Sequence, residues 1–173
     1  MPARFLISSQ TLGTAAASVT FSAIPATYTD LVLKMTTRMA TGTFGEFSVQ
    51  FNSDSSALYS DTILYGSGSA ADTYNNSGST SLNGILNTEG SSQTANTFSN
   101  NELYIPSYTA SQSKPVSAAS VTENNATTSY ISANAGLYRS NTAISSITII
   151  DNINSRSFAS GSSFYLYGIS KTN

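Results

Sequence analysis

Apolar and polar residues alternate with a period of two along nearly the whole chain, and no segment sustains the 3.6-residue period of a helix. The clearest alternating sets are Leu31, Leu33, Met35, Thr37 and Met39, followed by Phe47, Val49 and Phe51. Alternate side chains of a strand point to opposite faces of a sheet, so each set is expected to face a core. The residues between them, such as Glu46 and Ser48, are expected to face solvent, and residues 40–45 are expected to form a hairpin connection.

Further strands are expected at regular spacing, separated by clusters of Gly, Pro, Asn and Ser. They cover residues 5–8, 17–21, 62–65, 81–86, 98–105, 115–122, 128–139, 143–150 and 163–169. Residues 66–78 are expected to form a long loop. The only helical turn is expected within residues 54–59 or 108–113. The sequence therefore predicts an all-β fold: a single antiparallel β-sandwich domain over residues 1–173, jelly-roll-like, with about ten short strands.

The chain contains no histidine and no cysteine, and only 9% of its residues are charged. Serine, threonine and asparagine together make up 70 of the 173 residues. Histidine and cysteine supply most of the side chains that titrate or attack near neutral pH, so the composition argues against an enzyme. A surface of hydroxyl and amide groups gives little charge repulsion between copies, which suits a protein that packs against neighbours.

The 7 basic and 9 acidic residues are spread thinly along the chain. They form neither a basic stripe that would neutralise phosphates nor a polybasic cluster that would attract an anionic membrane. We therefore expect no nucleic-acid and no membrane partner. The apolar run near the N-terminus is too short for a signal peptide, and no stretch approaches the roughly 18 apolar residues of a membrane helix. These features predict a protein made in a cytoplasm and not exported by a cleaved signal.

One serine and one lysine have the sequence spacing of a known catalytic pair. Ser111 and Lys114 match the Ser-x-x-Lys spacing that some lysine-dependent acyl enzymes use, because a serine nucleophile needs a base within hydrogen-bond reach. In a chain with 33 serines the match carries little weight, and it falls in an expected loop before Pro115.

Acidic residues are also candidates, since glycoside hydrolysis uses paired carboxylates. The candidates are Asp54, Asp61, Asp72, Glu89, Glu102 and Glu123. Nothing in their spacing brings two of them together. Calcium accepts carboxylate and carbonyl oxygens, which makes residues 54–72 a candidate calcium region, although no EF-hand or nonapeptide pattern is present. We therefore predict no catalytic residue, no metal ligand and no cofactor.

The last expected strand is apolar or aromatic on both faces. Phe164 and Leu166 point one way, whereas Tyr165, Tyr167 and Ile169 point the other. A neighbouring loop covering the outer face, or tyrosines that keep their hydroxyls in water, would account for this pattern. Alternatively, Tyr165, Tyr167 and Ile169 enter a contact between subunits, and they are the candidate subunit-contact residues of this chain.

Sugar binding is the main competing function at the level of composition. Lectin-like sandwiches stack sugar rings on exposed aromatic side chains and bind hydroxyls with Asn, Asp and backbone groups. Tyrosine and asparagine occur together in residues 74–76 and 130–134. Tryptophan, a favoured stacking residue, is absent.

Seven segments resemble, in the same order, those of a family of small virion proteins encoded by tailed bacteriophages. They are LISSQTLG at 6–13, AASVTFSAIP at 16–25, YTDLVL at 28–33, NELYIPSY at 101–108, KPVS at 114–117, ENNA at 123–126 and GSSFYLYGI at 161–169. Together they span nearly the whole chain. The resemblance implies a β-sandwich that serves as a building piece of the particle, and it transfers no active residues.

The resemblance and the composition lead to one expectation: a bacteriophage virion structural protein without catalytic activity. It would be an outer capsid decoration or cement protein, located on the capsid surface and assembled in the host cytoplasm. Its partners would be the major capsid protein and copies of itself, as a homodimer or homotrimer that covers apolar edge surface. The alternative is a tail-fibre or receptor-binding module that recognises host surface glycans.

Overall fold

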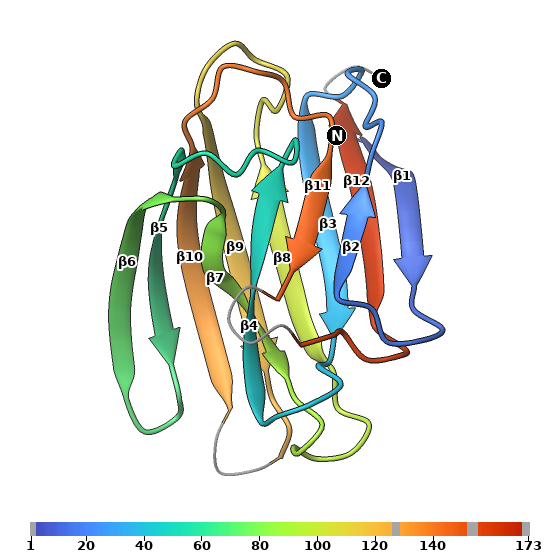
Figure 1. Cartoon of the computed structure of the whole chain (residues 1–173), viewed down its shortest axis with the longest axis vertical. Helices are drawn as coiled ribbons and strands as arrows, with labels where there is room; N and C mark the ends of the chain where they lie inside the picture. The colour runs from blue at the N-terminus through green and yellow to red at the C-terminus, as the bar shows by residue number, and fades with distance from the viewer. Residues whose placement is uncertain (1–2, 126–128, 152–155, 171–173) are drawn as a thin grey trace.

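The computed structural model describes residues 3–125, 129–151 and 156–170 (Figure 1). Ala126 and Thr128, which belong to a segment and a strand singled out above, lie outside these residues. The described residues form twelve β-strands and no helix. The strands are β1 (Ala3–Thr11), β2 (Ser18–Phe21), β3 (Asp30–Thr37), β4 (Phe44–Phe51), β5 (Tyr59–Gly66), β6 (Ala71–Ser79), β7 (Leu82–Glu89), β8 (Ser99–Ile105), β9 (Lys114–Thr122), β10 (Tyr130–Tyr138), β11 (Ile147–Ile150) and β12 (Ser163–Ser170).

The strands form two antiparallel sheets that face each other, as Figure 1 shows. The large sheet has eight strands in the order β1-β12-β3-β8-β9-β10-β5-β6, and the small sheet has four in the order β2-β11-β4-β7. An all-β antiparallel sandwich is thus confirmed, with twelve strands in the described residues where about ten were expected.

The strand order is that of a jelly roll. If the hairpins β5–β6 and β9–β10 are set aside, eight strands remain, and they pair first with last towards the middle of the chain. These pairs are β1 with β12, β2 with β11, β3 with β8, and β4 with β7. Such nested antiparallel pairs, divided between two sheets, define the eight-stranded jelly roll. The two extra hairpins both join the large sheet beyond β8 and extend it past the edge of the small sheet.

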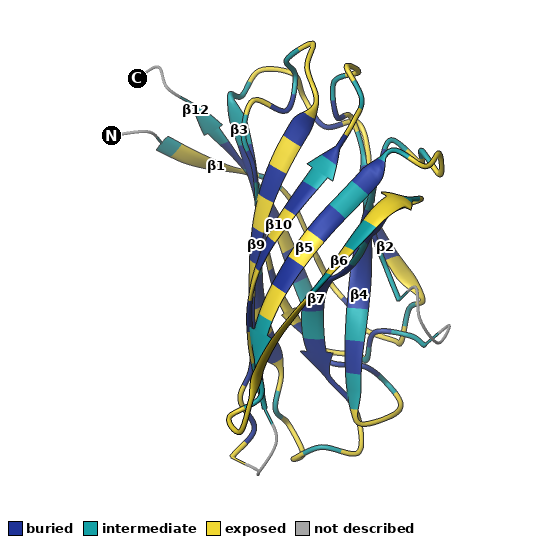
Figure 2. Cartoon of the chain, turned by 90° about the vertical axis from the view of Figure 1, so that its left-hand side faces the viewer, coloured by how far each residue is buried: buried dark blue, intermediate teal, exposed yellow. Residues whose placement is uncertain are grey.

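One hydrophobic core lies between the sheets. Leu33, Met35 and Phe164 enter it from the large sheet, and Phe47 and Val49 enter it from the small sheet. The two apolar sets expected to face a core are therefore confirmed, since each of their members is almost completely buried. Figure 2 shows the same alternation of buried and exposed residues along β9, β10 and β5.

Four local predictions are wrong. Residues 71–79 form strand β6 and are not part of a long loop, because they pair along their length with β5. Residues 40–45 are not a hairpin, since β3 pairs with β12 and β8 while β4 lies in the other sheet. The expected helical turn is absent from 54–59 and 108–113, which contain turns, bends and the start of β5. Ser48, which was expected to face solvent, is fully buried, and its hydroxyl accepts a hydrogen bond from the Gly84 backbone N–H at 3.3 Å.

Candidate functional site

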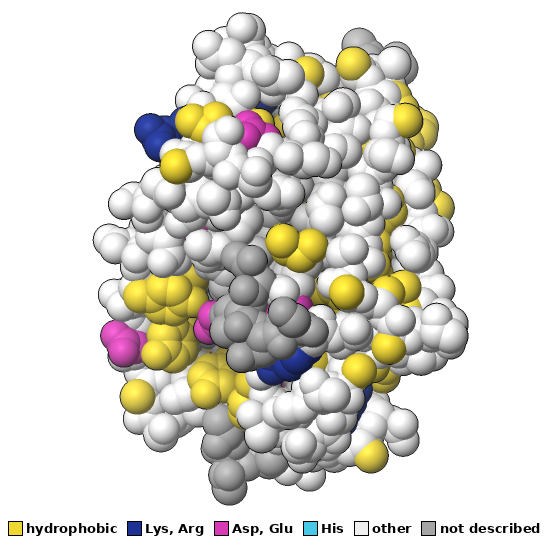
Figure 3. Space-filling view, in the orientation of Figure 1, with side chains coloured by type: hydrophobic (Ala, Val, Ile, Leu, Met, Phe, Trp, Pro, Cys, Tyr) yellow, Lys and Arg dark blue, Asp and Glu magenta, His cyan; other side chains and the backbone are white. Residues whose placement is uncertain are grey.

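A cleft of about 380 Å³ lies where side chains of β5, β6 and β10 in the large sheet meet side chains of β4 and β7 in the small sheet. It is lined by Phe44, Gly45, Glu46, Ile63, Tyr65, Tyr74, Asn87, Tyr130 and Arg156. Figure 3 shows hydrophobic side chains gathered on this side of the molecule, with acidic side chains beside them. The cleft falls within the usual size range of small-molecule sites, about 300–1,000 Å³.

Four aromatic rings form a continuous series around the cleft. The centroids of Phe44 and Tyr130 are 4.8 Å apart with the rings at 89°. Tyr130 lies 6.1 Å from Tyr65 at 57°, and Tyr65 lies 6.2 Å from Tyr74 at 66°. All four residues are half-buried, whereas the aromatic rings of the core are fully buried. The cleft rings therefore keep faces that a ligand can touch.

The acidic group of the cleft is Glu46. Its carboxylate accepts a hydrogen bond from the Tyr74 hydroxyl, and burial raises the pKa of Glu46 above its ordinary value. Gly84 on β7 makes room for this pair, since a Cβ at that position would lie 2.7 Å from Glu46 Oε2 and 3.0 Å from the Tyr74 hydroxyl. Gly84 also has a φ of +62°, which glycine adopts without strain.

The basic group of the cleft is Arg156, and other groups already hold it. Its Nε lies 3.2 Å from Asp151 Oδ2, in an ion pair whose carboxylate is fully buried. Its Nη1 donates a hydrogen bond to the Phe44 carbonyl at 2.6 Å. The guanidinium is therefore fixed in position beside the Asp151 carboxylate, and its charge also acts on Glu46, whose pKa it lowers by less than burial raises it.

The sequence segments named for sugar binding converge only in part. Tyr74 and Tyr130, which are far apart in the chain, both line this cleft. The asparagines of those segments lie elsewhere: Asn76 donates to Asp61 at 2.6 Å, and Asn134 is buried and bonds to the Ile85 carbonyl. Glu46 and Arg156 were not candidates, because a carboxylate on an alternating strand and a lone arginine after β11 carry no local signal.

The predicted subunit-contact residues lie on the outer face of β12. Phe164 and Leu166 point into the core and are fully buried, as expected. Tyr165 is 37% exposed, and Tyr167 and Ile169 are half-buried. The three face away from the core beside the edge strand β1, so a contact between subunits through them stays a prediction.

The Ser111 and Lys114 pair does not form a catalytic arrangement. Lys114 is fully buried at the start of β9, and its ammonium donates to the carbonyls of Gln112 and Ser140. Burial lowers the pKa of Lys114 below its ordinary value. The hydrogen bonds described for this lysine thus go to the backbone and not to the exposed Ser111.

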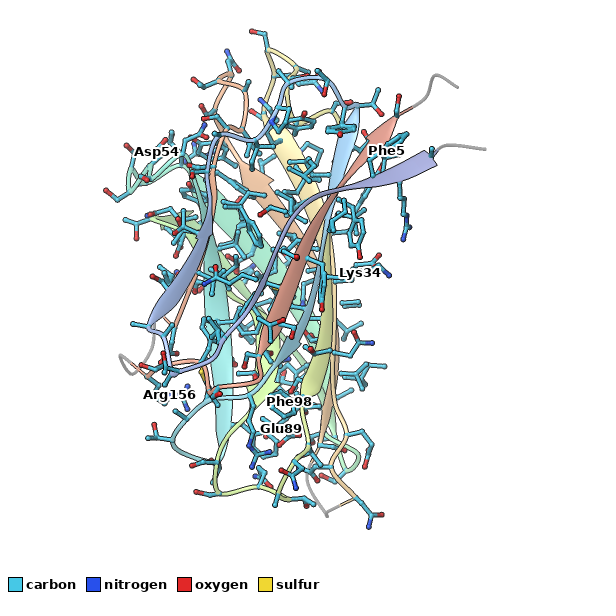
Figure 4. All side chains as sticks on the ribbon, turned by 90° about the vertical axis from the view of Figure 1, so that its right-hand side faces the viewer. Phe5, Lys34, Asp54, Glu89, Phe98 and Arg156 are labelled. Carbon is cyan, nitrogen blue, oxygen red and sulfur yellow. The ribbon has the colours of Figure 1, made fainter. Side chains whose placement is uncertain are left out.

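None of the six carboxylates considered for hydrolysis lines the aromatic cleft. Asp54 lies at the opposite end of the sandwich from Glu89 and from Arg156, as Figure 4 shows. Glu102 pairs with Lys34 at 2.8 Å on the outer face of the large sheet. Among residues 3–125, 129–151 and 156–170, no three acidic side chains gather closely enough to hold a metal ion. That part of the chain also contains no helix able to cross a membrane.

A second surface lies on the outer face of β9, β10 and β5, and we call it the outer patch. Its members are Pro115, Ser117, Ala119, Val121, Ile131, Ala133, Ala135, Leu137, Ser60, Thr62 and Leu64. None of these side chains is charged. The largest are also widely exposed, with 64% of Ile131, 52% of Leu64 and 40% of Val121 accessible.

Comparison with protein-family models gives no match, and comparison with curated proteins gives none. Among solved structures, the crystal structure of the Caenorhabditis elegans galectin LEC-6 is similar over 96% of this chain and 95% of that chain. The sequence identity is 11% and the TM-score is 0.35. The class of this protein therefore follows from its own sheet order: it is an antiparallel jelly-roll β-sandwich with an aromatic cleft at one edge.

Proposed function

We infer that this protein is a structural component of a tailed-bacteriophage particle, an outer capsid decoration protein that binds and stabilises the shell of major capsid protein. The inference is supported by the segments along nearly the whole chain that resemble small phage virion proteins. It is also compatible with the jelly roll, a fold used by viral capsid and lectin domains. Since fold alone does not define function, the surfaces carry the argument.

The outer patch is the observation that carries this proposal. Val121 and Ile131 are directly opposite on neighbouring strands, and the next row aligns Ala119, Ala133 and Leu64. Large aliphatic side chains stand beside alanines, so a partner could approach the sheet closely. Exposed apolar side chains gathered in this way mark protein interaction sites, and the missing charges remove the cost of desolvating them.

Copies of the protein would meet through the other end of the large sheet. β1 is an edge strand there, and Phe5 and Leu6 are 47% and 55% exposed. An edge strand presents unpaired backbone groups that favour pairing with another chain. A homodimer or homotrimer through β1 and the outer residues Tyr165, Tyr167 and Ile169 would cover this edge, and it needs no catalysis, metal or cofactor.

The experiment is cosedimentation of the purified chain with capsids assembled from the major capsid protein of the same genome. Ile131→Asp and Leu64→Asp place a charge in the outer patch and should abolish cosedimentation. Thr36→Asp, at an exposed position on the outer face of β3, is the matched control and should bind like the unmodified chain. Capsid binding that survives both patch variants would contradict the proposal.

A tail-fibre or receptor-binding module for host glycans is the second candidate, and the aromatic cleft favours it. The two candidates differ in copy number. A shell component is present in hundreds of copies per particle and a tail component in a handful, so quantitative gel densitometry of purified virions separates them.

A further inference from the structure

We propose that the cleft between β4, β5, β6, β7 and β10 binds a neutral saccharide. One face of a sugar ring would pack on the tyrosine rings, and two adjacent hydroxyls would donate to the Glu46 carboxylate. This inference goes beyond attachment to a capsid and does not depend on it, because the cleft and the outer patch share no residue.

The aromatic rings supply the apolar part of the site. A sugar ring has apolar faces made of C–H groups and a rim of hydroxyls, so it needs a ring to pack on and polar groups at the side. Tyr65, Tyr74 and Tyr130 offer partly exposed rings at different inclinations within one cleft. A tyrosine combines an apolar ring with a hydroxyl that can donate and accept hydrogen bonds.

The Glu46 carboxylate supplies acceptors for hydroxyl groups. An ionised carboxylate has about four acceptor positions on two oxygens, and the Tyr74 hydroxyl occupies one of them. Hydroxyl donors of a sugar can fill the others. Hydrogen bonds to an ionised group are shorter and stronger than neutral ones, and the half-buried position of Glu46 shields them from water.

The charge distribution selects a neutral ligand. Arg156, the basic residue that lines the cleft, is held by Asp151 and by the Phe44 carbonyl. An incoming phosphate or carboxylate would therefore meet the negative charge of Glu46 beside a cation that Asp151 already holds and that also acts on Glu46. A sugar without charge brings hydroxyl donors and no such repulsion.

The arrangement of the polar groups in the cleft depends on the missing side chain at Gly84. The absence of a side chain at this position lets the Glu46 and Tyr74 groups approach β7 and remain hydrogen-bonded to each other. An alanine there would push the carboxylate away, because its Cβ would lie closer to Glu46 Oε2 than real Cβ atoms come to any atom. Gly84→Ala should therefore weaken binding while the residues of the outer patch stay in place.

The test is a titration of the full chain with sugar probes, monitored by isothermal titration calorimetry and by two-dimensional NMR. The neutral probes are the methyl glycosides of glucose, galactose, mannose and N-acetylglucosamine, and the acidic probe is N-acetylneuraminic acid. At least one neutral probe should bind more tightly than the acidic one. Glu46→Gln removes the charge-assisted bonds and should weaken that binding by about tenfold or more. Glu102→Gln, an exposed carboxylate on the outer face, is the matched control and should change nothing.

Tyr65→Ala should abolish binding, with Tyr104→Ala on the outer face of β8 as its control. Circular dichroism of each variant identifies those that fail to fold, and Glu46→Gln keeps the test valid if Tyr65→Ala does not fold. The saccharide inference is overturned if no neutral probe binds, or if binding is unchanged in Glu46→Gln and Tyr65→Ala. If no sugar binds while the outer-patch variants still abolish capsid cosedimentation, only the saccharide inference is wrong.

Discussion

Phe158 connects the two sheets through ring contacts, and its replacement should reveal how far the sandwich depends on them. Its ring lies 5.5 Å from Phe47 on β4 at 82°, and 5.3 Å from Phe164 on β12 at 80°. β4 belongs to the small sheet and β12 to the large sheet, and all three side chains are fully buried. The backbone around Phe158 is also fixed, because its N–H and carbonyl both bond to Ala16, at 2.8 and 3.1 Å.

Two replacements separate the loss of volume from the loss of ring contacts. Phe158→Ala leaves a cavity and should lower the free energy of unfolding by about 3–5 kcal/mol. Phe158→Leu keeps most of the volume but loses two edge-to-face contacts of about 0.5–1.5 kcal/mol each, so about 1–3 kcal/mol in total. For a chain of this length, the alanine variant should melt about 6–20 °C lower.

Urea unfolding followed by circular dichroism measures both variants, and a double-mutant cycle with Phe164→Leu isolates one ring pair. The cycle should give a coupling energy of about 0.5–1.5 kcal/mol. Phe98→Leu is the control, because Phe98 is 36% exposed and should contribute less. An alanine variant within about 1 kcal/mol of the unmodified chain would refute the view that this ring joins the sheets.

Three further predictions concern buried and surface groups. Burial raises the pKa of Glu89, so the folded protein keeps the Glu89 proton to a higher pH than the unfolded chain does. The stability that this proton contributes is present below pH 4.5 and is lost as the pH rises through the folded pKa. Because Glu89 Oε1 is buried without a partner, Glu89→Gln should stabilise the protein at neutral pH by about 1–2 kcal/mol and make little difference below the unfolded pKa, which paired urea titrations would check. Gly168→Ala should destabilise by about 1–3 kcal/mol, since a Cβ there would lie 2.2 Å from the Tyr28 ring; an unchanged melting temperature would contradict this. Lys34→Ala should cost less than about 1 kcal/mol in the same assay, because the ion pair with Glu102 is nearly half exposed, and a larger loss would show that the pair is more than a surface contact.

Period-two alternation was enough to predict most strands, because burial of one face leaves the same pattern wherever a strand lies in the sandwich. It failed for β6, whose sequence ADTYNNSGS has no apolar face. That strand is at the edge of the large sheet and is fixed by pairing with β5, which a local pattern does not record. The connection at 40–45 was misread for a similar reason. A short polar link between two strands looks the same whether they pair with each other or cross to opposite sheets.

The cleft was predictable only in its aromatic part. Tyr74 and Tyr130 were conspicuous because tyrosine beside asparagine is a common composition of sugar-binding surfaces. Glu46 was expected on a solvated face of β4, and its place in the cleft depends on Tyr74 from β6. Arg156 reaches the cleft through its bonds to Asp151 and to a carbonyl of β4. Such long-range convergence needs the assembled sheets, so no spacing along the chain could have signalled it.

Both proposed surfaces depend on the same departure from a plain jelly roll. The outer patch consists of residues on β5, β9 and β10, and the tyrosines of the cleft come from β5, β6 and β10. These four strands are the two hairpins added to the eight nested strands, and they widen only the large sheet. The part of the large sheet that extends past the small sheet has a free outer face, and its inner face meets β4 and β7 along one edge, where the cleft lies. The free face can bind a flat partner, while the cleft can hold a small polar ligand. The eight-stranded frame thus supplies most of the core, and the inserted hairpins supply the surfaces on which the proposed binding functions depend.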